Sequence, residues 1–390
     1  MTHLRGITWD HPRGHSPVER AGRDFRAKHP GITIEWDRRS LKDFGDYPII
    51  PLAQRYDLIM MDYPFTGTAL ASKALVALEE YVPADYLEDQ RGNSVGRSCQ
   101  SYNLGGHQLA LAVDAACQVS VLLRDVMDRL GVAVPSTWDQ VFEAAKALPP
   151  DHSIAIPWEP TGAYCSFVSL CANIGGDGII TPERGLDPDV GEEAARLMQR
   201  LTKIVHPTSF YLNPIKLMDF MEVSDEIVYV PLCFGYSNYA RTAKAGKVLD
   251  FANIPGKDGK PSGSILGGVG LAVSEFSRNI PAAVEFAMMV AGGEYQRTAF
   301  FEAGGQPGHR SAWVDPDVNK ASNNYFADTL DTLDQSYLRP RYVGYDKFQV
   351  QAGDMMHNFL KDSFIGGGGK SAREIVKDFN ACMLSEIKGG

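Results

Sequence analysis

The chain has 390 residues, of which 44% are hydrophobic and 22% are charged, and its formal net charge at pH 7 is −10. This composition is typical of a soluble globular protein and excludes wholesale disorder, and the length favours two domains or lobes over one. The acidic balance excludes the basic footprint of a nucleic-acid-binding protein and also a polybasic membrane patch. No apolar run approaches the roughly 18 residues that a membrane-spanning helix needs.

The N-terminus and the cysteines bear on the cellular compartment. The first six residues are polar and lead at once into a strand-like Ile7-Thr8-Trp9, so we expect no secretion signal in this sequence. The six cysteines form no C-x-x-C pair and no zinc spacing with histidine, and we expect no metal or other cofactor. Most of them lie in apolar segments, which favours buried, reduced thiols. We therefore expect a cytoplasmic protein, or a periplasmic one if Met1 replaced a leader.

The first 65 residues alternate between strand and helix. Ser16-Pro17-Val18-Glu19 predicts a helix start, in which Ser16 is the N-cap and Glu19 completes a capping box. The pattern predicts strands at 3–10, 32–36 and 57–62, with a second helix over 41–55. This β–α–β–α–β order predicts a parallel, doubly wound sheet, whose ligands bind beyond the carboxyl ends of the strands.

A second unit begins near residue 113. A strand at 107–113 runs into Asp114, an amphipathic helix is predicted over 119–130, and Thr137-Trp138-Asp139-Gln140 predicts a capping box before the next helix. A strand at 266–273 returns the chain to the first unit. The other predicted strands are 153–157, 226–231 and 248–254, and the other predicted helices are 141–148, 164–174, 190–205, 281–291, 294–303, 345–361 and 372–387.

An ordered set of segments carries a family resemblance. The set consists of Ile7-Thr8-Trp9-Asp10, Pro30-Gly31-Ile32-Thr33-Ile34, Tyr56-Asp57-Leu58-Ile59-Met60, Pro135-Ser136-Thr137-Trp138-Asp139, Ile227-Val228-Tyr229-Val230, Glu294-Tyr295-Gln296-Arg297-Thr298-Ala299-Phe300 and Gly304-Gly305-Gln306-Pro307. The fourth segment is similar to the family's P-x-T-W-x-E. Together they resemble the extracellular solute-binding proteins of ABC importers, in the sugar-binding family that includes maltose-binding protein.

The resemblance implies a two-lobed periplasmic-binding-protein-like α/β fold, each lobe a doubly wound, mostly parallel sheet. The first lobe would hold residues 1–113 plus 266–310 and the second 114–265 plus 311–390, joined by hinge strands. The family function implied is capture of a small polar solute (a sugar, an oligosaccharide or a sugar acid) in an interlobe cleft by hinge closure. The implied partners are this carbohydrate-like ligand and an ABC permease, and the implied oligomeric state is a monomer.

Recognition of a sugar needs planar hydrogen-bonding groups for its hydroxyls and aromatic rings for its apolar face. Trp9, Asp10, His11 and Arg13 follow the first predicted strand, and the Arg and His would also suit an acidic ligand such as a uronate. The alternative is a solvated loop with Trp9 in the core.

A second cluster follows the third predicted strand. Asp62, Tyr63 and Phe65 match by position the family's acidic and aromatic ligand contacts. The alternative is that Tyr63 and Phe65 only pack against the next helix. Asp114, at the first proposed crossover, either contacts ligand hydroxyls or caps a helix.

The remaining candidates come from the second lobe and from a late turn. Glu159 and Tyr164 follow one predicted strand, and Phe234, Tyr236 and Asn238 follow another, although each alone is more often a core residue. Gln306 and Arg310 lie in the late proline turn. Arg310 is either a ligand clamp or one partner of a surface ion pair.

Two other functions remain open beside ligand capture. The first is a cytoplasmic enzyme, a lyase, hydrolase or isomerase acting on a small acid, because His11 close to Asp10 and Asp62 is competent for acid–base chemistry. Arg13 would orient the anion and Tyr63 would complete that set. The second is a cytoplasmic ligand sensor with a protein partner.

Overall fold

The computed structural model describes residues 1–241, 246–366 and 369–389, and it divides the chain into two α/β units. Unit 1 comprises Met1–Ala116, Gly267–Lys320 and Arg341–Asp346. Unit 2 comprises Cys117–Leu266, Ala321–Pro340 and Lys347–Gly390. Residues 311–320, which the sequence analysis assigns to the second lobe, therefore lie in unit 1.

The sheet of unit 1 carries the strand order β2-β1-β3-β12-β6. Its strands are β1 (Thr2–Trp9), β2 (Ile32–Arg39), β3 (Leu58–Met61), β12 (Leu266–Val273) and β6 (Leu111–Leu122). The neighbours β2 and β3 both run parallel to β1, and β12 runs antiparallel to β3. The parallel β–α–β–α–β start and the strand over 266–273 are thereby confirmed.

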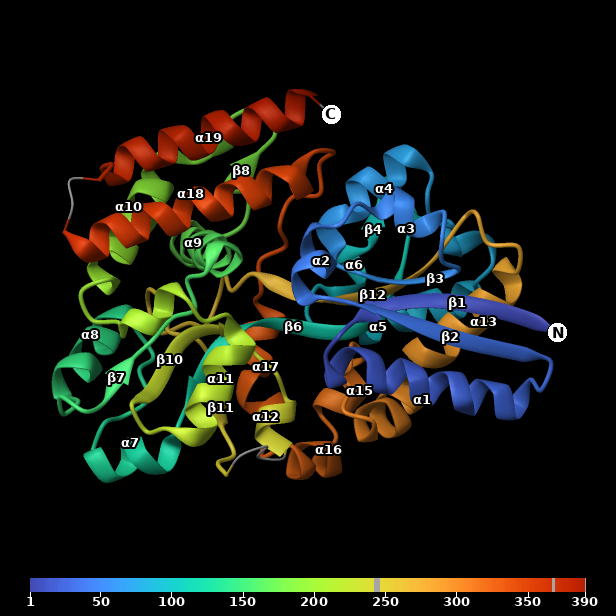
Figure 1. Cartoon of the computed structure of the whole chain (residues 1–390), viewed down its shortest axis with the longest axis horizontal. Helices are drawn as coiled ribbons and strands as arrows, with labels where there is room; N and C mark the ends of the chain where they lie inside the picture. The colour runs from blue at the N-terminus through green and yellow to red at the C-terminus, as the bar shows by residue number, and fades with distance from the viewer. Residues whose placement is uncertain (242–245, 367–368, 390) are drawn as a thin grey trace. The chain divides into compact units, whose positions relative to one another are not determined.

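Helices α1 (Pro12–Lys28) and α13 (Ile280–Ala291) cover one face of this sheet, and α3 (Ile49–Ala53) and α4 (Thr66–Ser72) lie on the other side (Figure 1). The covered face is a continuous core, in which alternate residues of the buried strands meet the apolar sides of both helices. Phe25 of α1 and Phe286 of α13 meet edge to face, with ring centroids 5.5 Å apart.

The start of α1 differs from the prediction. The helix begins at Pro12, and His11 is its N-cap, because Nδ1 of His11 accepts a hydrogen bond of 3.1 Å from the backbone N–H of Arg13. The predicted cap at Ser16 is therefore wrong, and Pro17 lies inside the helix. His11-Pro12 offers the same signals as Ser16-Pro17, a side-chain acceptor and a first-turn proline, but one turn earlier. Arg13 consequently belongs to the first turn of a helix.

Shorter elements complete unit 1. They are α2 (Leu41–Asp46), η1 (Tyr63–Phe65), η2 (Leu78–Glu80), α5 (Ala84–Asn93), α6 (Ser98–Ser101), β4 (Asn103–Leu104), β5 (His107–Gln108), α14 (Gly293–Tyr295), the π-helical turn η4 (Gln296–Phe300), α15 (Arg310–Trp313) and α16 (Pro316–Ala321).

In unit 2, β10 (Ile227–Phe234) lies between β6 and β7 (Ser153–Ile154), and β11 (Asp250–Ala252) also pairs with β6. The helix predicted over 119–130 is wrong in its first part, since β6 continues to Leu122 and helix α7 covers only Arg124–Leu130. Residues 119–122 pair with both β10 and β11, and this pairing satisfies their backbone hydrogen bonds. It therefore overrides the helical spacing of their apolar side chains.

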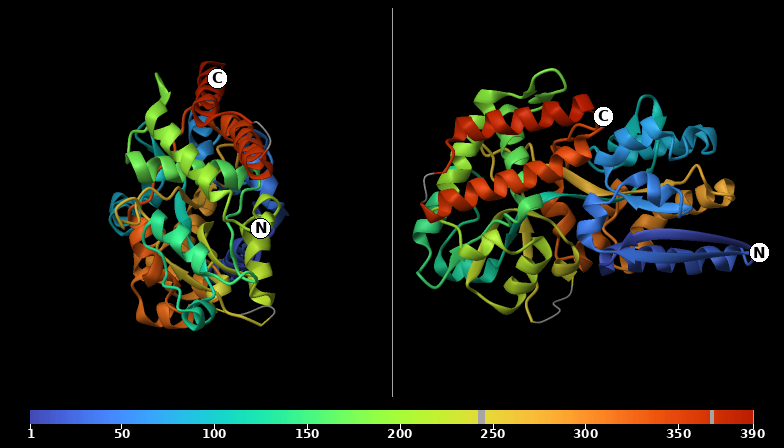
Figure 2. Two further views of the ribbon diagram at one scale, coloured as in Figure 1. Left: turned by 90° about the vertical axis from the view of Figure 1, so that its left-hand side faces the viewer. Right: turned by 45° about the horizontal axis from the view of Figure 1, so that its top comes forward.

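The helices of unit 2 pack around aromatic side chains. α18 (Tyr345–Ile365) and α19 (Ala372–Gly389) run side by side in all views (Figures 1 and 2), and rings of Phe348 and Phe379 on these helices meet Tyr164 and Phe167 of α9 (Pro160–Gly175). The predicted capping box is confirmed, because the Thr137 side chain accepts from the backbone of Gln140 at the start of α8 (Trp138–Ala147). The remaining elements are α10 (Pro188–Leu201), α11 (Pro214–Val223), α12 (Asn238–Arg241), α17 (Tyr325–Asp334), η3 (Pro207–Phe210), β8 (Ile180–Thr181) and β9 (Gly185–Leu186).

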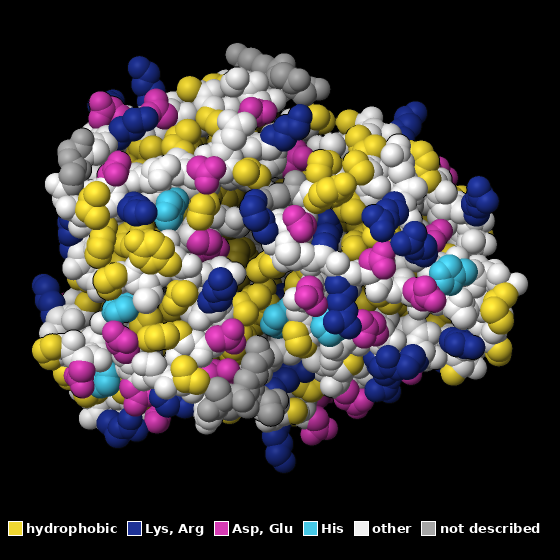
Figure 3. Space-filling view, viewed as in Figure 1, with side chains coloured by type: hydrophobic (Ala, Val, Ile, Leu, Met, Phe, Trp, Pro, Cys, Tyr) yellow, Lys and Arg dark blue, Asp and Glu magenta, His cyan; other side chains and the backbone are white. Residues whose placement is uncertain are grey.

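All six cysteines are free thiols and five of them are buried, as predicted, whereas Cys382 is half-buried. On the face shown in Figure 3, basic and acidic side chains are interspersed. No helix within residues 1–241, 246–366 and 369–389 is long and apolar enough to cross a membrane.

Candidate functional site

A buried ion pair joins two of the sequence-predicted residues of unit 1. Arg13 donates from Nε to Oδ2 of Asp114 over 2.8 Å and from Nη2 to Oδ1 over 2.6 Å. The two side chains are only 5% and 1% exposed. Burial raises the pKa of the Asp114 carboxyl, and the Arg13 guanidinium opposes that rise. The sequence left Asp114 as a ligand contact or a helix cap, and the structure gives it a third role, as the counterion of Arg13.

Tyr102 is a buried residue of unit 1 that the sequence-based predictions missed. Its ring is buried, its hydroxyl is 3.4 Å from the carbonyl oxygen of Met61, and its ring meets that of Tyr63 edge to face. Burial raises the pKa of Tyr102 well above its usual value, and the carboxylates of Asp62 and Asp114 add to the rise. Tyr102 follows the short helix α6 and belongs to no motif, so the sequence carries no signal for it.

The residues after β3 form a tight turn. Asp62 is half-buried and accepts a hydrogen bond of 2.9 Å from the backbone N–H of Tyr63, which caps η1. Tyr63 and Phe65 are almost fully buried within unit 1. Their positions fit the alternative in which they pack against the following helix, and their contact with a ligand stays a prediction.

The residues after β1 point in different directions. Trp9 is buried in the core of unit 1, against Phe44 and against Gly14, where an added Cβ would lie 2.4 Å from the indole. Asp10 is 64% exposed and lies 3.6 Å from the guanidinium of Arg38. His11 is buried as the cap of α1. Within the segment 9–13, Arg13 therefore contacts Asp114, whereas Asp10 faces solvent.

Gln306 and Arg310 lie in the late proline turn of unit 1. Gln306 is fully buried, and its side-chain amide donates to the carbonyl oxygen of Ala115 over 2.8 Å, while the backbone N–H of Ala115 donates to the carbonyl of Gln306. Arg310 is half-buried at the start of α15, where His309 is the N-cap. Gln306 therefore supports the strand that carries Asp114.

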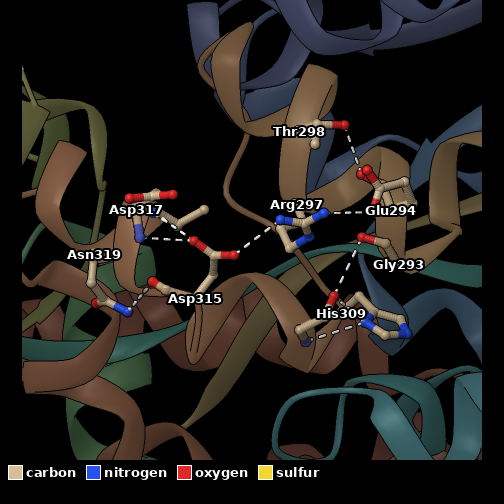
Figure 4. Close-up of polar contacts among 10 residues, drawn as sticks. Gly293, Glu294, Arg297, Thr298, His309, Asp315, Asp317 and Asn319 are labelled. Carbon is tan, nitrogen blue, oxygen red and sulfur yellow. Dashed lines mark hydrogen bonds and ion pairs between the residues drawn. The ribbon is translucent and has the colours of Figure 1, made fainter.

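A separate ion-pair network lies close to this turn in unit 1 (Figure 4). Arg297 donates to Glu294 over 2.7 Å and to Asp315 over 3.1 Å, and it is 39% exposed. Asp315 also accepts from the backbone of Asp317 and so caps α16. These residues belong to no predicted site, and their contacts with one another account for their positions.

In unit 2, Glu159 lies at the N-terminus of α9. Its carboxylate folds back over the first turn, where an added Cβ on Gly162 would lie 2.5 Å from Oε2. This oxygen is buried and has no hydrogen-bond partner among the described residues. Burial raises the pKa of Glu159 to about 7, and backbone hydrogen bonds partly oppose that rise. Burial raises the pKa of Cys233 in β10, and the Glu159 carboxylate adds to that rise.

Three more of the predicted contacts of unit 2 lie at or just after the end of β10. Phe234 and Asn238 are half-buried and Tyr236 is buried. Gly235 is held by a hydrogen bond from its backbone N–H to the carbonyl of Cys117. Tyr164, by contrast, packs inside the aromatic cluster with Phe348 and Phe379, as a core residue of unit 2 would.

A second residue that the sequence analysis missed is Arg341 of unit 1. Its Nη1 donates to three carbonyl oxygens, those of Gln100, Ser101 and Asn103, over 2.8, 3.0 and 2.7 Å. Burial lowers the pKa of its guanidinium, and Tyr63 lies near enough to oppose that shift. Within the described part of the chain, no group of three or more His, Cys, Asp or Glu residues is arranged to hold a metal ion.

Comparisons with known proteins support one fold. No family model matches the chain. A protein of Deinococcus radiodurans named as a probable ABC transporter-binding protein is 22% identical over 316 residues, which are 76% of this chain and 72% of the relative. The maltose-bound MalE3 of T. maritima superposes with a TM-score of 0.79 and 16% identity, covering 100% of both chains. A solute-binding protein of Agrobacterium radiobacter K84 in complex with ribitol gives 0.79 and 16%, covering 100% of this chain and 99% of that one.

The whole-chain superpositions confirm the predicted α/β class and the resemblance on which the sequence analysis relied. The chain therefore has the fold of the two-lobed, sugar-binding solute-binding proteins of ABC importers.

Proposed function

We propose that this protein is the solute-binding component of an ABC importer and that it captures a small polyhydroxylated solute. The observation that carries the proposal is the match of the whole chain to solute-binding proteins whose names give maltose, alpha-D-tagatose, ribitol or D-mannitol as the ligand. The relative in Deinococcus radiodurans, named for an ABC transporter, supports the same partner.

The chemistry of the candidate residues supports such a ligand. Hydroxyl groups donate well to carboxylates, and unit 1 carries the carboxylates of Asp62 and Asp114. Unit 2 carries Glu159, with one buried oxygen that has no partner among the described residues. Aromatic side chains for the apolar face of a sugar lie at the end of β10 in unit 2, namely Phe234, its last residue, and Tyr236 just after it. We propose these residues as ligand contacts.

An ABC permease is the proposed protein partner, and a monomer is the proposed state. A ligand shifts a binding protein toward its transport-competent form only if that form binds the ligand more tightly than the other form does. Hinge closure over the solute, which the sequence analysis predicts, belongs to the same proposal.

The test is a thermal-shift screen of the purified chain against sugars, polyols and oligosaccharides, with each hit measured by calorimetry and recovered for mass spectrometry. A ligand that binds only the folded state stabilises it by about 2.7 kcal/mol when the ligand is present at a hundred times its Kd, and the melting temperature rises accordingly. The expected result is a neutral sugar or polyol recovered unchanged. A hit that is converted to a product would replace the binding function by an enzymatic one.

A further inference from the structure

We propose that residues 341–346 form a clasp, held on unit 1 by Arg341, that limits the movement of unit 2 about the predicted hinge and so prepares the chain for its solute. Arg341 is then a positioning residue, which acts through the clasp and does not touch the ligand. The effect on ligand binding rests on the proposed function, whereas the restraint on movement does not.

The first observation is an excursion of the chain. Residues up to Pro340 belong to unit 2, residues 341–346 belong to unit 1, and from Lys347 onward the chain is in unit 2 again. This excursion adds two passages between the units to those at 116–117, 266–267 and 320–321. Each passage is a covalent link, so the excursion ties unit 2 to unit 1 at a further place in the chain.

Arg341 holds the start of the clasp on unit 1. Its Nη1 donates to the carbonyl oxygens of Gln100, Ser101 and Asn103 over 2.8, 3.0 and 2.7 Å. Hydrogen bonds from a charged donor are stronger than those between neutral groups. The carbonyl oxygen of Arg341 also lies against Gly67 of α4, where an added Cβ would be only 1.9 Å away. Both the side chain and the backbone of Arg341 are therefore fixed on unit 1.

The chain just before the clasp is held in unit 2. The backbone N–H of Tyr337 donates to the carbonyl of Ser264 over 2.7 Å, and the N–H of Leu266 donates to the carbonyl of Tyr337 over 2.8 Å. Leu266 is the residue at which the chain leaves unit 2 for unit 1. The stretch from Tyr337 to Arg341 reaches at most about 14 Å. A movement of unit 2 that needs a longer reach must therefore break one of the two anchors.

A restraint of this kind changes ligand affinity without a contact to the ligand. A hinged protein that closes over a solute loses freedom of movement on binding, and that loss opposes binding. The clasp removes part of this freedom before the ligand arrives. Loosening the clasp should therefore weaken the binding of every ligand by the same factor and leave the order of preference among ligands unchanged.

Two variants loosen the clasp by unrelated means. Arg341→Ala removes the donor to three carbonyl oxygens, whereas Gly67→Ala keeps Arg341 and places a methyl group against its carbonyl. Arg341→Lys keeps the charge and should restore part of what Arg341→Ala loses. The matched controls are Arg91→Ala, which removes an exposed arginine of α5, and Gly92→Ala, whose Cβ would meet nothing within 4 Å.

The restraint is measured without ligand. Spin labels are attached at Asp85→Cys in unit 1 and at Asp151→Cys in unit 2, which are both exposed positions. The background is Cys382→Ser, because the other five cysteines are buried. Electron paramagnetic resonance then gives the distribution of distances between the labels. We expect Arg341→Ala and Gly67→Ala to widen this distribution relative to the wild type and to both controls.

The effect on affinity is measured by calorimetry with D-mannitol, ribitol and maltose as probes. We expect Arg341→Ala and Gly67→Ala to weaken each probe that binds the wild type by about fivefold, with unchanged ratios among the probes. An affinity loss confined to Arg341→Ala, or a change of preference among the probes, would mean that Arg341 contacts the ligand and would overturn its positioning role.

Distance distributions that stay as narrow in both clasp variants as in the wild type overturn the clasp itself. If no probe binds the wild type, the proposed function fails for these ligands, and the distance measurement alone then decides whether the clasp restrains unit 2. If Gly67→Ala does not fold, Arg341→Ala and its rescue by Arg341→Lys carry the same test.

Discussion

The carboxylate of Glu159 lies over Gly162 in the first turn of α9, with Oε2 only 2.5 Å from the position that a Cβ on Gly162 would take. The helix is sixteen residues long and starts at Pro160, directly after Glu159. A carboxylate at a helix N-terminus is ordinarily stabilised as an anion. Here burial dominates and raises the pKa of Glu159 to about 7.

The first prediction is a stability that depends on pH through Glu159. A carboxyl whose pKa is higher in the folded state binds more protons there, so the folded protein loses stability as the pH rises from about 4.5 to about 7 and loses no more above that window. Glu159→Gln removes this loss and should stabilise the protein at pH 8 by up to about 3 kcal/mol more than at pH 4.5. Urea unfolding of both proteins at the two pH values measures the difference. An equal effect of the substitution at pH 4.5 and pH 8 would contradict it.

The second prediction concerns the space above the first turn of α9. Gly162→Ala would place a Cβ 2.3 Å from the carbonyl oxygen of Pro157 and against the Glu159 carboxylate, so it should destabilise the protein by about 1–3 kcal/mol. Gly92→Ala in α5 is the control, since nothing lies within 4 Å of its Cβ. That change should be neutral or stabilising by up to about 1 kcal/mol, because alanine favours the helix. Chemical unfolding of the two variants compares them directly.

The third prediction concerns Gln306, which the sequence analysis proposed as a ligand contact. Its amide is fully buried and donates to the carbonyl of Ala115, so Gln306→Ala leaves that oxygen without its donor and opens a space. We expect a loss of about 2–4 kcal/mol in the free energy of unfolding. Gln335→Ala, at an exposed position of unit 2, should change it by less than about 0.5 kcal/mol. A loss of ligand affinity at full stability would instead favour direct contact of Gln306 with the ligand.

The fourth prediction tests closure, which rests on the sequence-based prediction of a hinged, two-lobed binding protein. A saturating ligand from the thermal-shift screen should lower the radius of gyration measured by small-angle X-ray scattering. A protein in which the ligand does not move the lobes would show the same scattering with and without it. The same experiment in a matched buffer containing a sugar that does not bind is the control.

Local signals accounted for much of the fold. The strand over 266–273 was predicted to the residue, and the Thr137 cap was recognised because its partner Gln140 is only three residues away. The cap at Ser16 was misjudged because the His11-Pro12 pair offers an equivalent signal nearby. The helix over 119–130 was misjudged because the pairing of β6 with β10 and β11 depends on strands that come more than a hundred residues later.

The candidate site was harder to predict for the same reason. Arg13 and Asp114 were both singled out by their positions after strands, but their partnership spans 101 residues and no local pattern carries it. Tyr102 and Arg341 were missed because each is placed by tertiary contacts and follows no predicted strand. Local sequence patterns identify the residues near the end of a strand. The partners of their charged groups, however, come from distant parts of the chain and cannot be predicted from those patterns.

Unit 1 is assembled from three separate segments of the chain, and this has a consequence for biosynthesis. In the finished fold β3 pairs with β12 on one edge, yet Leu58–Met61 leaves the ribosome long before Leu266–Val273 does. The nascent chain therefore carries an apolar strand with an open edge while Cys117–Leu266, the first segment of unit 2, is being translated, and such edges invite wrong pairing. Unit 1 is not complete until Asp346 has been added, so fragments that stop at Ala116 or Lys320 should be insoluble or bound by chaperones.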